Sequence, residues 1–208
     1  MPDRMTYMPD LTALQRICGL LDRGEITLAQ FLSQFAGRMV QDIGCSRAGV
    51  RMLIQSKDGP ALRGAGLVDT TGAPVRVPDM PGLDAGPYFD TLLRDGCVVS
   101  PDCLNDPVTA GLVPEYLAPQ DVRSLLDVSF SVNGVLYGTF TCEQVGETQA
   151  WGHHQLALLR QIGSRVSLTL MHNITAHIDT TPGALWEPST PNRLMTMPMT
   201  LDGEIPER

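Results

Sequence analysis

The segment from residue 125 to 142 constrains the fold most strongly, because its side chains alternate on both sides of a two-residue turn. Leu126, Val128, Phe130 and Val132 alternate with Leu125, Asp127, Ser129 and Ser131, and Leu136, Gly138, Phe140 and Cys142 continue one face after the turn. The turn, Asn133-Gly134, favours the positive φ angles that join two antiparallel strands. This segment therefore predicts a β-hairpin.

A second pair of strands is predicted from residue 45 onward. Ala48, Val50, Met52 and Ile54 alternate with Arg47, Gly49, Arg51 and Leu53, and Asp58-Gly59 precedes a return strand through Leu62, Gly64, Gly66 and Val68. Cys97-Val98-Val99 is typical of a further short strand. The proline- and glycine-rich residues 70–87 predict a loop, and residues 100–121 an irregular segment with one or two helical turns.

Helical periodicity surrounds these strands. Asp10 can cap a helix that carries Leu11, Leu14, Ile17 and Leu21, and Thr27-Leu28-Ala29-Gln30 matches a capping box before the apolar positions 31, 35, 39 and 43. Gly44 and Gly96 are typical helix stops, the second after a short helix around residues 89–93. A long helix is expected from about Gly152 to His172. Its apolar stripe, widened by Leu158, Ile162 and Leu168, suggests contact with a second copy of the chain.

Composition excludes several classes of protein. The 208 residues carry a net charge of −8, which disfavours binding to nucleic acid or to an anionic membrane surface. No apolar run reaches the roughly 18 residues of a membrane span, and no signal peptide is recognisable. Five cysteines without a CxxC motif suggest a reducing cytoplasm. The proline-rich stretch Asp179–Arg208 predicts a flexible tail.

Three segments resemble the GAF domain, a sensory module related to PAS domains. The most specific is Tyr116–Gly146, YLAPQDVRSLLDVSFSVNGVLYGTFTCEQVG, and Trp151-Gly152-His153-His154 is similar to the start of the family's last helix. The stretch from Val99 through Asp106-Pro107 resembles the family's passage over its pocket. The resemblance covers about residues 27–173.

The resemblance implies an α+β fold with a GAF/PAS-like central antiparallel sheet. Its N- and C-terminal helices would lie on one face, and a loop- and helix-covered pocket, here residues 70–121, on the other. The expected organisation is an N-terminal helix in residues 1–26, a GAF-like domain in 27–178 and the tail in 179–208. Loops held over a rigid sheet often carry binding residues.

The candidate ligand-binding residues lie in or beside this covering segment or in the hairpin. They are Tyr88, Asp102, Cys103, Asp106, Tyr116, Arg123 and Asp127. Asp127 interrupts an apolar strand, so it either recognises a cationic or hydroxylated ligand or is neutralised by a partner such as Arg123. No catalytic set, phosphate loop or metal-ligand spacing is recognisable.

The cofactor stays open. The Asn-Lys-Phe-Asp-Glu motif of cyclic-nucleotide GAF domains and the Cys-His pair of bilin-carrying ones are absent, and all four histidines fall in or after the final helix. Covalent bilin and haem are therefore disfavoured, and an unidentified small-molecule ligand is expected.

The resemblance implies a stand-alone cytoplasmic sensor or binding module that acts in signal transduction as a homodimer or through a partner protein. One alternative is a thiol-dependent enzyme similar to the free methionine sulfoxide reductases, with Cys97 and Cys103 as a redox pair rather than buried structural thiols. Another is an interaction scaffold with a vestigial pocket, whose partners contact the tail.

Overall fold

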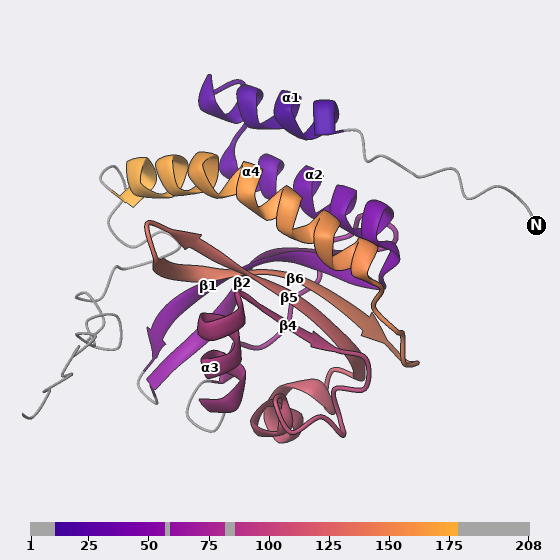
Figure 1. Cartoon of the computed structure of the whole chain (residues 1–208). Helices are drawn as coiled ribbons and strands as arrows, with labels where there is room; N and C mark the ends of the chain where they lie inside the picture. Colours follow the sequence, from indigo (N-terminus) through magenta and orange to yellow (C-terminus); the bar gives the residue numbers. More distant parts are fainter. Residues whose placement is uncertain (1–10, 57–58, 82–85, 179–208) are drawn as a thin grey trace, which may run out of the picture.

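The computed structural model describes residues 11–56, 59–81 and 86–178. These residues form a curved antiparallel sheet with three helices on one face and one helix with irregular turns on the other (Figure 1). The predicted α+β architecture is confirmed. The predicted cap at Asp10, the turn residue Asp58 and the tail 179–208 lie outside the described residues.

Six strands make up the sheet, in the order β3-β2-β1-β6-β5-β4. They are β1 (Arg47–Ser56), β2 (Gly59–Asp69), β3 (Met80–Pro81), β4 (Cys97–Ser100), β5 (Val122–Val132) and β6 (Val135–Val145). The predicted hairpin is β5 with β6, and its turn residues Asn133 and Gly134 have φ angles of 52° and 79°. Both angles fit the type I′ turn. The short strand β3 lies inside the segment that was predicted to be a loop, and it pairs with β2.

Helices α2 (Leu28–Met39) and α4 (His153–Ile178) lie on one face of the sheet, and α1 (Leu11–Asp22) packs on the outer side of these two helices; together they form the helical layer (Figure 1). Helix α3 (Gly86–Asp95), the 3-10 turn η2 (Ala110–Leu112) and the π-helical turn η3 (Val113–Leu117) lie on the other face. Helix α2 continues into another π-helical turn, η1 (Val40–Gly44), before Gly44 ends it with a φ of 73°. Helix α4 extends six residues beyond the predicted end at His172.

The capping box at the start of α2 is confirmed. The Gln30 backbone N–H donates to Thr27 Oγ1 at 3.2 Å, and the Thr27 N–H donates to Gln30 Oε1 at 2.8 Å. These bonds satisfy two of the backbone donors that a helix start leaves without partners. The start of α2 is therefore fixed by local sequence, as the motif predicted.

Two hydrophobic clusters lie on opposite faces of the sheet. The larger one joins α1, α2 and α4 to inward side chains such as Val50, Val128 and Phe140. The smaller one joins α3 and η3 to side chains such as Leu62, Val98 and Leu125. Alternation along each strand sends successive side chains to these two faces.

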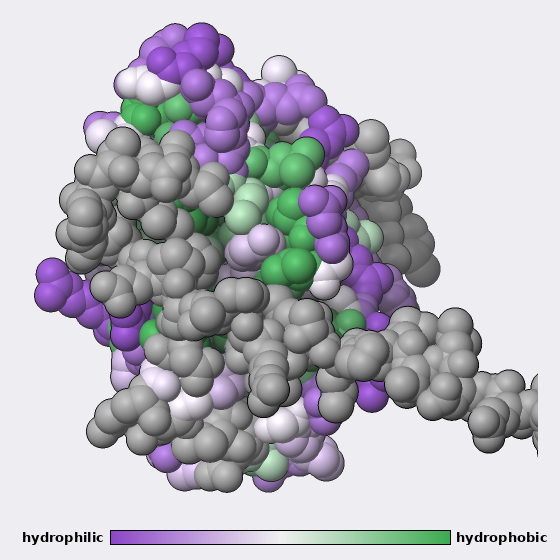
Figure 2. Space-filling view, turned by 90° about the vertical axis from the view of Figure 1, so that its left-hand side faces the viewer, coloured by the Kyte–Doolittle hydropathy of each residue, from purple (hydrophilic) through white to green (hydrophobic). Residues whose placement is uncertain are grey.

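The apolar stripe of α4 is mostly satisfied within the chain. Leu158 and Ile162, which suggested a surplus face, are 2% and 3% exposed, while Leu168 is 68% exposed. Figure 2 shows green hydrophobic residues in the upper half of the molecule, where the helices lie, bordered by purple hydrophilic ones. Of the three residues that suggested contact with a second copy of the chain, only Leu168 is exposed. None of the described helices has the length and apolarity that a membrane crossing requires.

Glycine at position 138 is required by the close contact of β6 with β1. A Cβ atom at Gly138 would lie 1.9 Å from the Arg51 carbonyl oxygen, whereas one at Gly37 of α2 would meet no atom within 4 Å. We expect Gly138→Ala to lower the free energy of unfolding by at least about 2 kcal/mol, since backbone must move. Gly37→Ala should raise it by about 0.5–1 kcal/mol through helix propensity. Urea denaturation measures both, and equal stabilities would contradict this packing.

Candidate functional site

A row of polar side chains crosses the sheet on the face that α3 and η3 cover. Cross-strand register places Arg51 opposite Thr139, Arg47 opposite Glu143, and Asp127 opposite Thr141. All six side chains are buried, five of them completely. With Tyr88, Ser100 and Tyr116 they form what we call the polar cluster: Arg47, Arg51, Tyr88, Ser100, Tyr116, Asp127, Thr139, Thr141 and Glu143.

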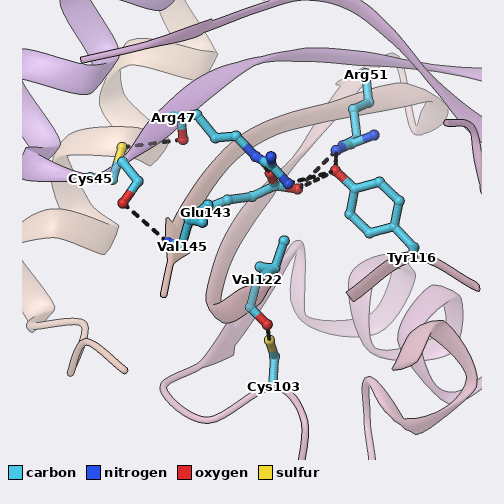
Figure 3. Close-up of polar contacts among 9 residues, drawn as sticks. Cys45, Arg47, Arg51, Cys103, Tyr116, Val122, Glu143 and Val145 are labelled. Carbon is cyan, nitrogen blue, oxygen red and sulfur yellow. Dashed lines mark hydrogen bonds and ion pairs between the residues drawn. The ribbon is translucent and has the colours of Figure 1, made fainter. Parts of the chain in front are cut away.

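Glu143 holds one half of the polar cluster together (Figure 3). Its Oε1 accepts hydrogen bonds from Arg51 Nη2 and the Tyr116 hydroxyl, both at 2.8 Å. Its Oε2 accepts from Arg47 Nε, so two arginines from β1 share one carboxylate. Burial would raise the pKa of Glu143, but Arg51 and Arg47 hold that pKa below its usual range. The carboxylate is therefore ionised at neutral pH.

Tyr116 of η3 covers the half of the polar cluster that surrounds Glu143. Its hydroxyl also accepts a hydrogen bond from Arg51 Nη2, and its ring centroid lies 4.6 Å from the Arg51 guanidinium carbon. This distance suits a cation–π contact. The turn η3 thus anchors to the sheet through one aromatic side chain.

Asp127 and Tyr88 form the other half of the polar cluster. The Tyr88 hydroxyl, from α3, donates to Asp127 Oδ2, and both side chains have no exposed surface. Burial raises the pKa of Asp127 to about 6, although the neighbouring Thr141 and Tyr88 hydroxyls and the Arg51 charge favour its ionised form. Burial also raises the pKa of Tyr88, so this phenol stays protonated and remains a donor.

Six buried polar atoms of the cluster form no hydrogen bond of good geometry with the described residues, although Thr141 lies close enough to Asp127, and Thr139 to Tyr88, to lower the pKa values of those two groups. The six atoms are Arg51 Nε and Nη1, Asp127 Oδ1, and the hydroxyl oxygens of Ser100, Thr139 and Thr141. A buried polar group without a partner costs about 1–3 kcal/mol. Such groups are rare in native proteins and are commonly paired by ordered water or by a ligand. Their concentration on one face marks this cluster as the candidate site.

Helix α3 and the turns that follow β4 seal the polar cluster. Tyr88 and Leu92 are the fully buried side chains of α3, and Leu112, Tyr116 and Leu117 come from η2 and η3. Gly96, with a φ of 70°, ends α3 and turns the chain into β4. The cover is therefore made of short elements that each bury only a few side chains.

Three of the sequence-predicted site residues meet in the polar cluster, namely Tyr88, Tyr116 and Asp127. Cys103 is also buried beneath the cover, where its thiol donates to the Val122 carbonyl at 3.3 Å. The alternative that Arg123 neutralises Asp127 is wrong, because Arg123 pairs with exposed Asp121.

Of the other predicted residues, Asp102 and Asp106 lie in turns and Arg123 lies near the start of β5. Asp102 is exposed and accepts a hydrogen bond from Asn105 Nδ2 at 2.8 Å. Asp106 accepts from the Val108 backbone N–H at 2.9 Å. Arg123, like these two, forms its polar contact outside the cluster, so the structure does not bring these three side chains to the candidate site.

Sequence analysis missed five members of the cluster that come from β1 and β6. Arg47 and Arg51 were recognised as one face of a strand, and Thr139 and Thr141 as one face of the hairpin. Their meeting depends on the pairing of β1 with β6, which are far apart in the chain. Charged residues on the inward face of predicted strands were the available signal.

The two cysteines considered as a redox pair belong to different hydrophobic clusters. Cys97 packs with the helical layer, and its sulfur accepts a hydrogen bond from Arg160 Nη2 at 3.0 Å. Cys103 packs on the other face, and burial raises its pKa to about 12. Because the thiolate is the nucleophile, Cys103 is poorly suited to attack a substrate at neutral pH.

The histidines of α4 that the structure describes lie outside the polar cluster. Among the described residues, no group of three or more His, Cys, Asp or Glu side chains could hold a metal ion. His153, His154 and His172 lie on α4, across the sheet from the polar cluster. The chemistry available in the cluster is recognition by ionic and hydrogen-bonding groups.

The raised pKa of Asp127 predicts a pH-dependent loss of stability. The folded protein holds the proton on Asp127 more tightly than the unfolded chain does. This difference stabilises the fold fully below about pH 4, and the stabilisation is lost as pH rises through the folded-state pKa of about 6. Relative to Asp127→Asn, the unmodified protein should lose up to about 3 kcal/mol of unfolding free energy between pH 4 and pH 7. Denaturant titrations at each pH measure this. The surface variant Asp102→Asn should show no comparable difference, and a constant difference for Asp127→Asn would contradict the assignment.

Known structures share this fold at low sequence identity. A phycocyanobilin-bound GAF domain from a cyanobacterial phytochrome is 14% identical, with a TM-score of 0.61, and the match covers 83% of this chain and 99% of that one. The blue-light absorbing form of the Thermosynechococcus elongatus PixJ GAF domain is 16% identical, with a TM-score of 0.56, over 83% and 96% of the two chains. Free methionine-R-sulfoxide reductase from Neisseria meningitidis, in complex with its substrate, is 18% identical, with a TM-score of 0.57, over 85% and 99%.

These likenesses show the fold and no more. No curated protein sequence matches the chain. The family model for the GAF domain matches residues 27–170, which include the sheet, α2, the cover and most of α4. The resemblance seen in the sequence is thereby confirmed, and the chain belongs to the GAF domain family.

Proposed function

We propose that this protein is a sensor that binds a small molecule in the polar cluster and passes its bound state to the helical layer. The observation that carries the proposal is buried Arg51, whose Nε and Nη1 have no hydrogen-bond partner among the described residues, together with nearby hydroxyl and carboxyl oxygens that lack a hydrogen bond of good geometry. A ligand that pairs with them would stabilise the folded state by the free energy of binding. The closed cover also fits a ligand that is enclosed rather than bound on an open surface.

The contacts of α4 support a route from the site to the helical layer. Arg160 of α4 donates to the Asp95 carbonyl at the end of α3, at 3.1 Å, and to Cys97 Sγ. Trp151, just before α4, donates from Nε1 to the Ser100 carbonyl at 3.3 Å. A displacement of α3 on ligand binding would therefore strain contacts made directly by α4.

Related structures are consistent with small-molecule binding but differ in chemistry. One neighbour is bound to phycocyanobilin, and another is a reductase in complex with its substrate. The present site carries buried charge in place of the thiol pair that a redox enzyme would need. We therefore favour a cytoplasmic sensor over a thiol enzyme. Its output is proposed to pass to a second copy or to a signalling partner, not to nucleic acid or membrane.

Native mass spectrometry of freshly purified protein tests the proposal. We expect an additional mass that disappears on denaturation, because a ligand that pairs with the six buried atoms is held by contacts that unfolding destroys. Thr139→Val removes one hydroxyl of the polar cluster with little change in shape and should lower the occupied fraction severalfold. Asp102→Asn, at an exposed turn, should leave it unchanged. A protein without added mass, which no compound of a metabolite library stabilises against heat, would contradict the proposal.

The hydrogen bond from Tyr88 to Asp127 should hold the cover closed. Tyr88→Phe removes the donor and leaves a buried carboxylate, at a cost of about 1.5–3 kcal/mol. Amides of α3 should then exchange with solvent roughly 10- to 100-fold faster in hydrogen-exchange mass spectrometry. Tyr137→Phe, on the helical face of the sheet, is the matched control. Unchanged exchange in α3 would show that other contacts keep the cover in place.

A further inference from the structure

Resting on the proposed function, we propose that the ligand presents a carboxylate group to Arg51 and that Asp127 is protonated in the complex. The polar cluster is rich in donors that have no acceptor. Arg51 Nε and Nη1 can only donate, and neither has a partner among the described residues. Glu143 Oε1 and the Tyr116 hydroxyl are both engaged by Arg51 Nη2, and Asp127, whose charge also acts on Arg51, forms no hydrogen bond with it.

Two hydroxyls of the polar cluster that lack a hydrogen bond of good geometry lie where a ligand at Arg51 would meet them. Thr139 is the cross-strand partner of Arg51, and Thr141 is the partner of Asp127 two residues further along β6. Arg51 and Asp127 therefore lie on either side of β6 with these two hydroxyls between them. Hydroxyls can donate as well as accept, so an oxyanion is the group that satisfies the largest number of these atoms.

Charge balance favours a ligand with a single negative charge, bound while Asp127 is protonated. Arg47 and Arg51 are balanced by Glu143 and by Asp127 when both carboxylates are ionised. An added carboxylate would leave one buried negative charge in excess, and buried charges must be paired. A proton on Asp127 removes the excess and turns this side chain into a further donor. Doubly charged phosphate, the main form of inorganic phosphate at pH 7.5, would exceed what one proton can balance.

Several groups face Asp127 and determine how easily its carboxylate is protonated. Tyr88 of α3 donates to its Oδ2, Arg51 of β1 favours the ionised form, and Glu143 of β6 favours the neutral one. Arg47 and Tyr116 act on Glu143 rather than on Asp127. Burial dominates these effects and raises the pKa of Asp127 to about 6, so protonation near neutral pH is accessible.

Four small probes test the inference on the full-length protein. Acetate carries the proposed group, acetamide is its neutral isostere, methylammonium is a cation of similar size, and inorganic phosphate is a larger oxyanion. Backbone amide shifts of β1 and β6 residues in two-dimensional NMR report binding. At pH 7.5 we expect acetate alone of the four probes to bind, and we expect acetate to bind about 20-fold more tightly at pH 5.5, because one proton is taken up with it.

Two variants separate the roles of charge and shape. Asp127→Asn carries a neutral donor at every pH, so it should bind acetate with the same affinity at pH 5.5 and pH 7.5. Thr139→Val should weaken acetate binding at both pH values but keep the roughly 20-fold ratio. Asp102→Asn, at the surface, should behave as the unmodified protein does.

The outcomes distinguish this inference from the proposed function. Binding of acetamide, methylammonium or phosphate in preference to acetate would overturn the carboxylate assignment and leave a small-molecule site in place. Acetate binding that does not depend on pH would overturn the protonation of Asp127. Failure of acetate to bind at 50 mM (about the weakest affinity of interest for so small a probe) would also overturn the inference. The native mass experiment decides the proposed function separately.

Discussion

The carboxylate of Glu143 is the group on which the covered face of the sheet depends. It lies between Arg47 and Arg51 and also accepts the Tyr116 hydroxyl, so one buried charge links β6, β1 and η3. Removing one partner of such a network leaves an uncompensated charge in the interior, which is strongly destabilising. The same network uses only one nitrogen of Arg51. The other two nitrogens of Arg51 have no hydrogen-bond partner among the described residues, and they leave polar groups in an otherwise apolar layer.

The two faces of the sheet contribute differently to the stability of the fold. Aromatic rings of Phe31, Phe35, Phe130 and Phe140 pack in succession on the helical face, with centroid distances of 5.6–5.8 Å. That face supplies apolar burial, the main favourable contribution to folding. The opposite face buries charged and hydroxyl-bearing side chains, which contribute less to stability unless they are paired. A stable helical face allows the fold to tolerate these polar groups on the other face.

Local signals in the sequence were sufficient for most of the fold. The Asn133-Gly134 turn and the Thr27–Gln30 capping box act through neighbouring residues, and both are present in the structure. The candidate site was only partly predictable, since Asp127 stood out as a charge within an apolar strand. Its relation to Arg51 arises from the placement of β6 between β1 and β5, a long-range pairing that periodicity does not encode. Conversely, Asp102 and Asp106 were plausible by position, yet the local turns engage both side chains.

The edges of the sheet limit how this protein can associate. An exposed edge strand offers free backbone groups to another chain, but β4 has only four residues and the Ser100 carbonyl is already bonded to the Trp151 indole. At the other edge, β3 has two residues, and one of them is Pro81, which has no N–H to donate. Both edge strands are thus poor templates for the addition of a strand from another chain. Association through the backbone of β3 or β4 is therefore disfavoured.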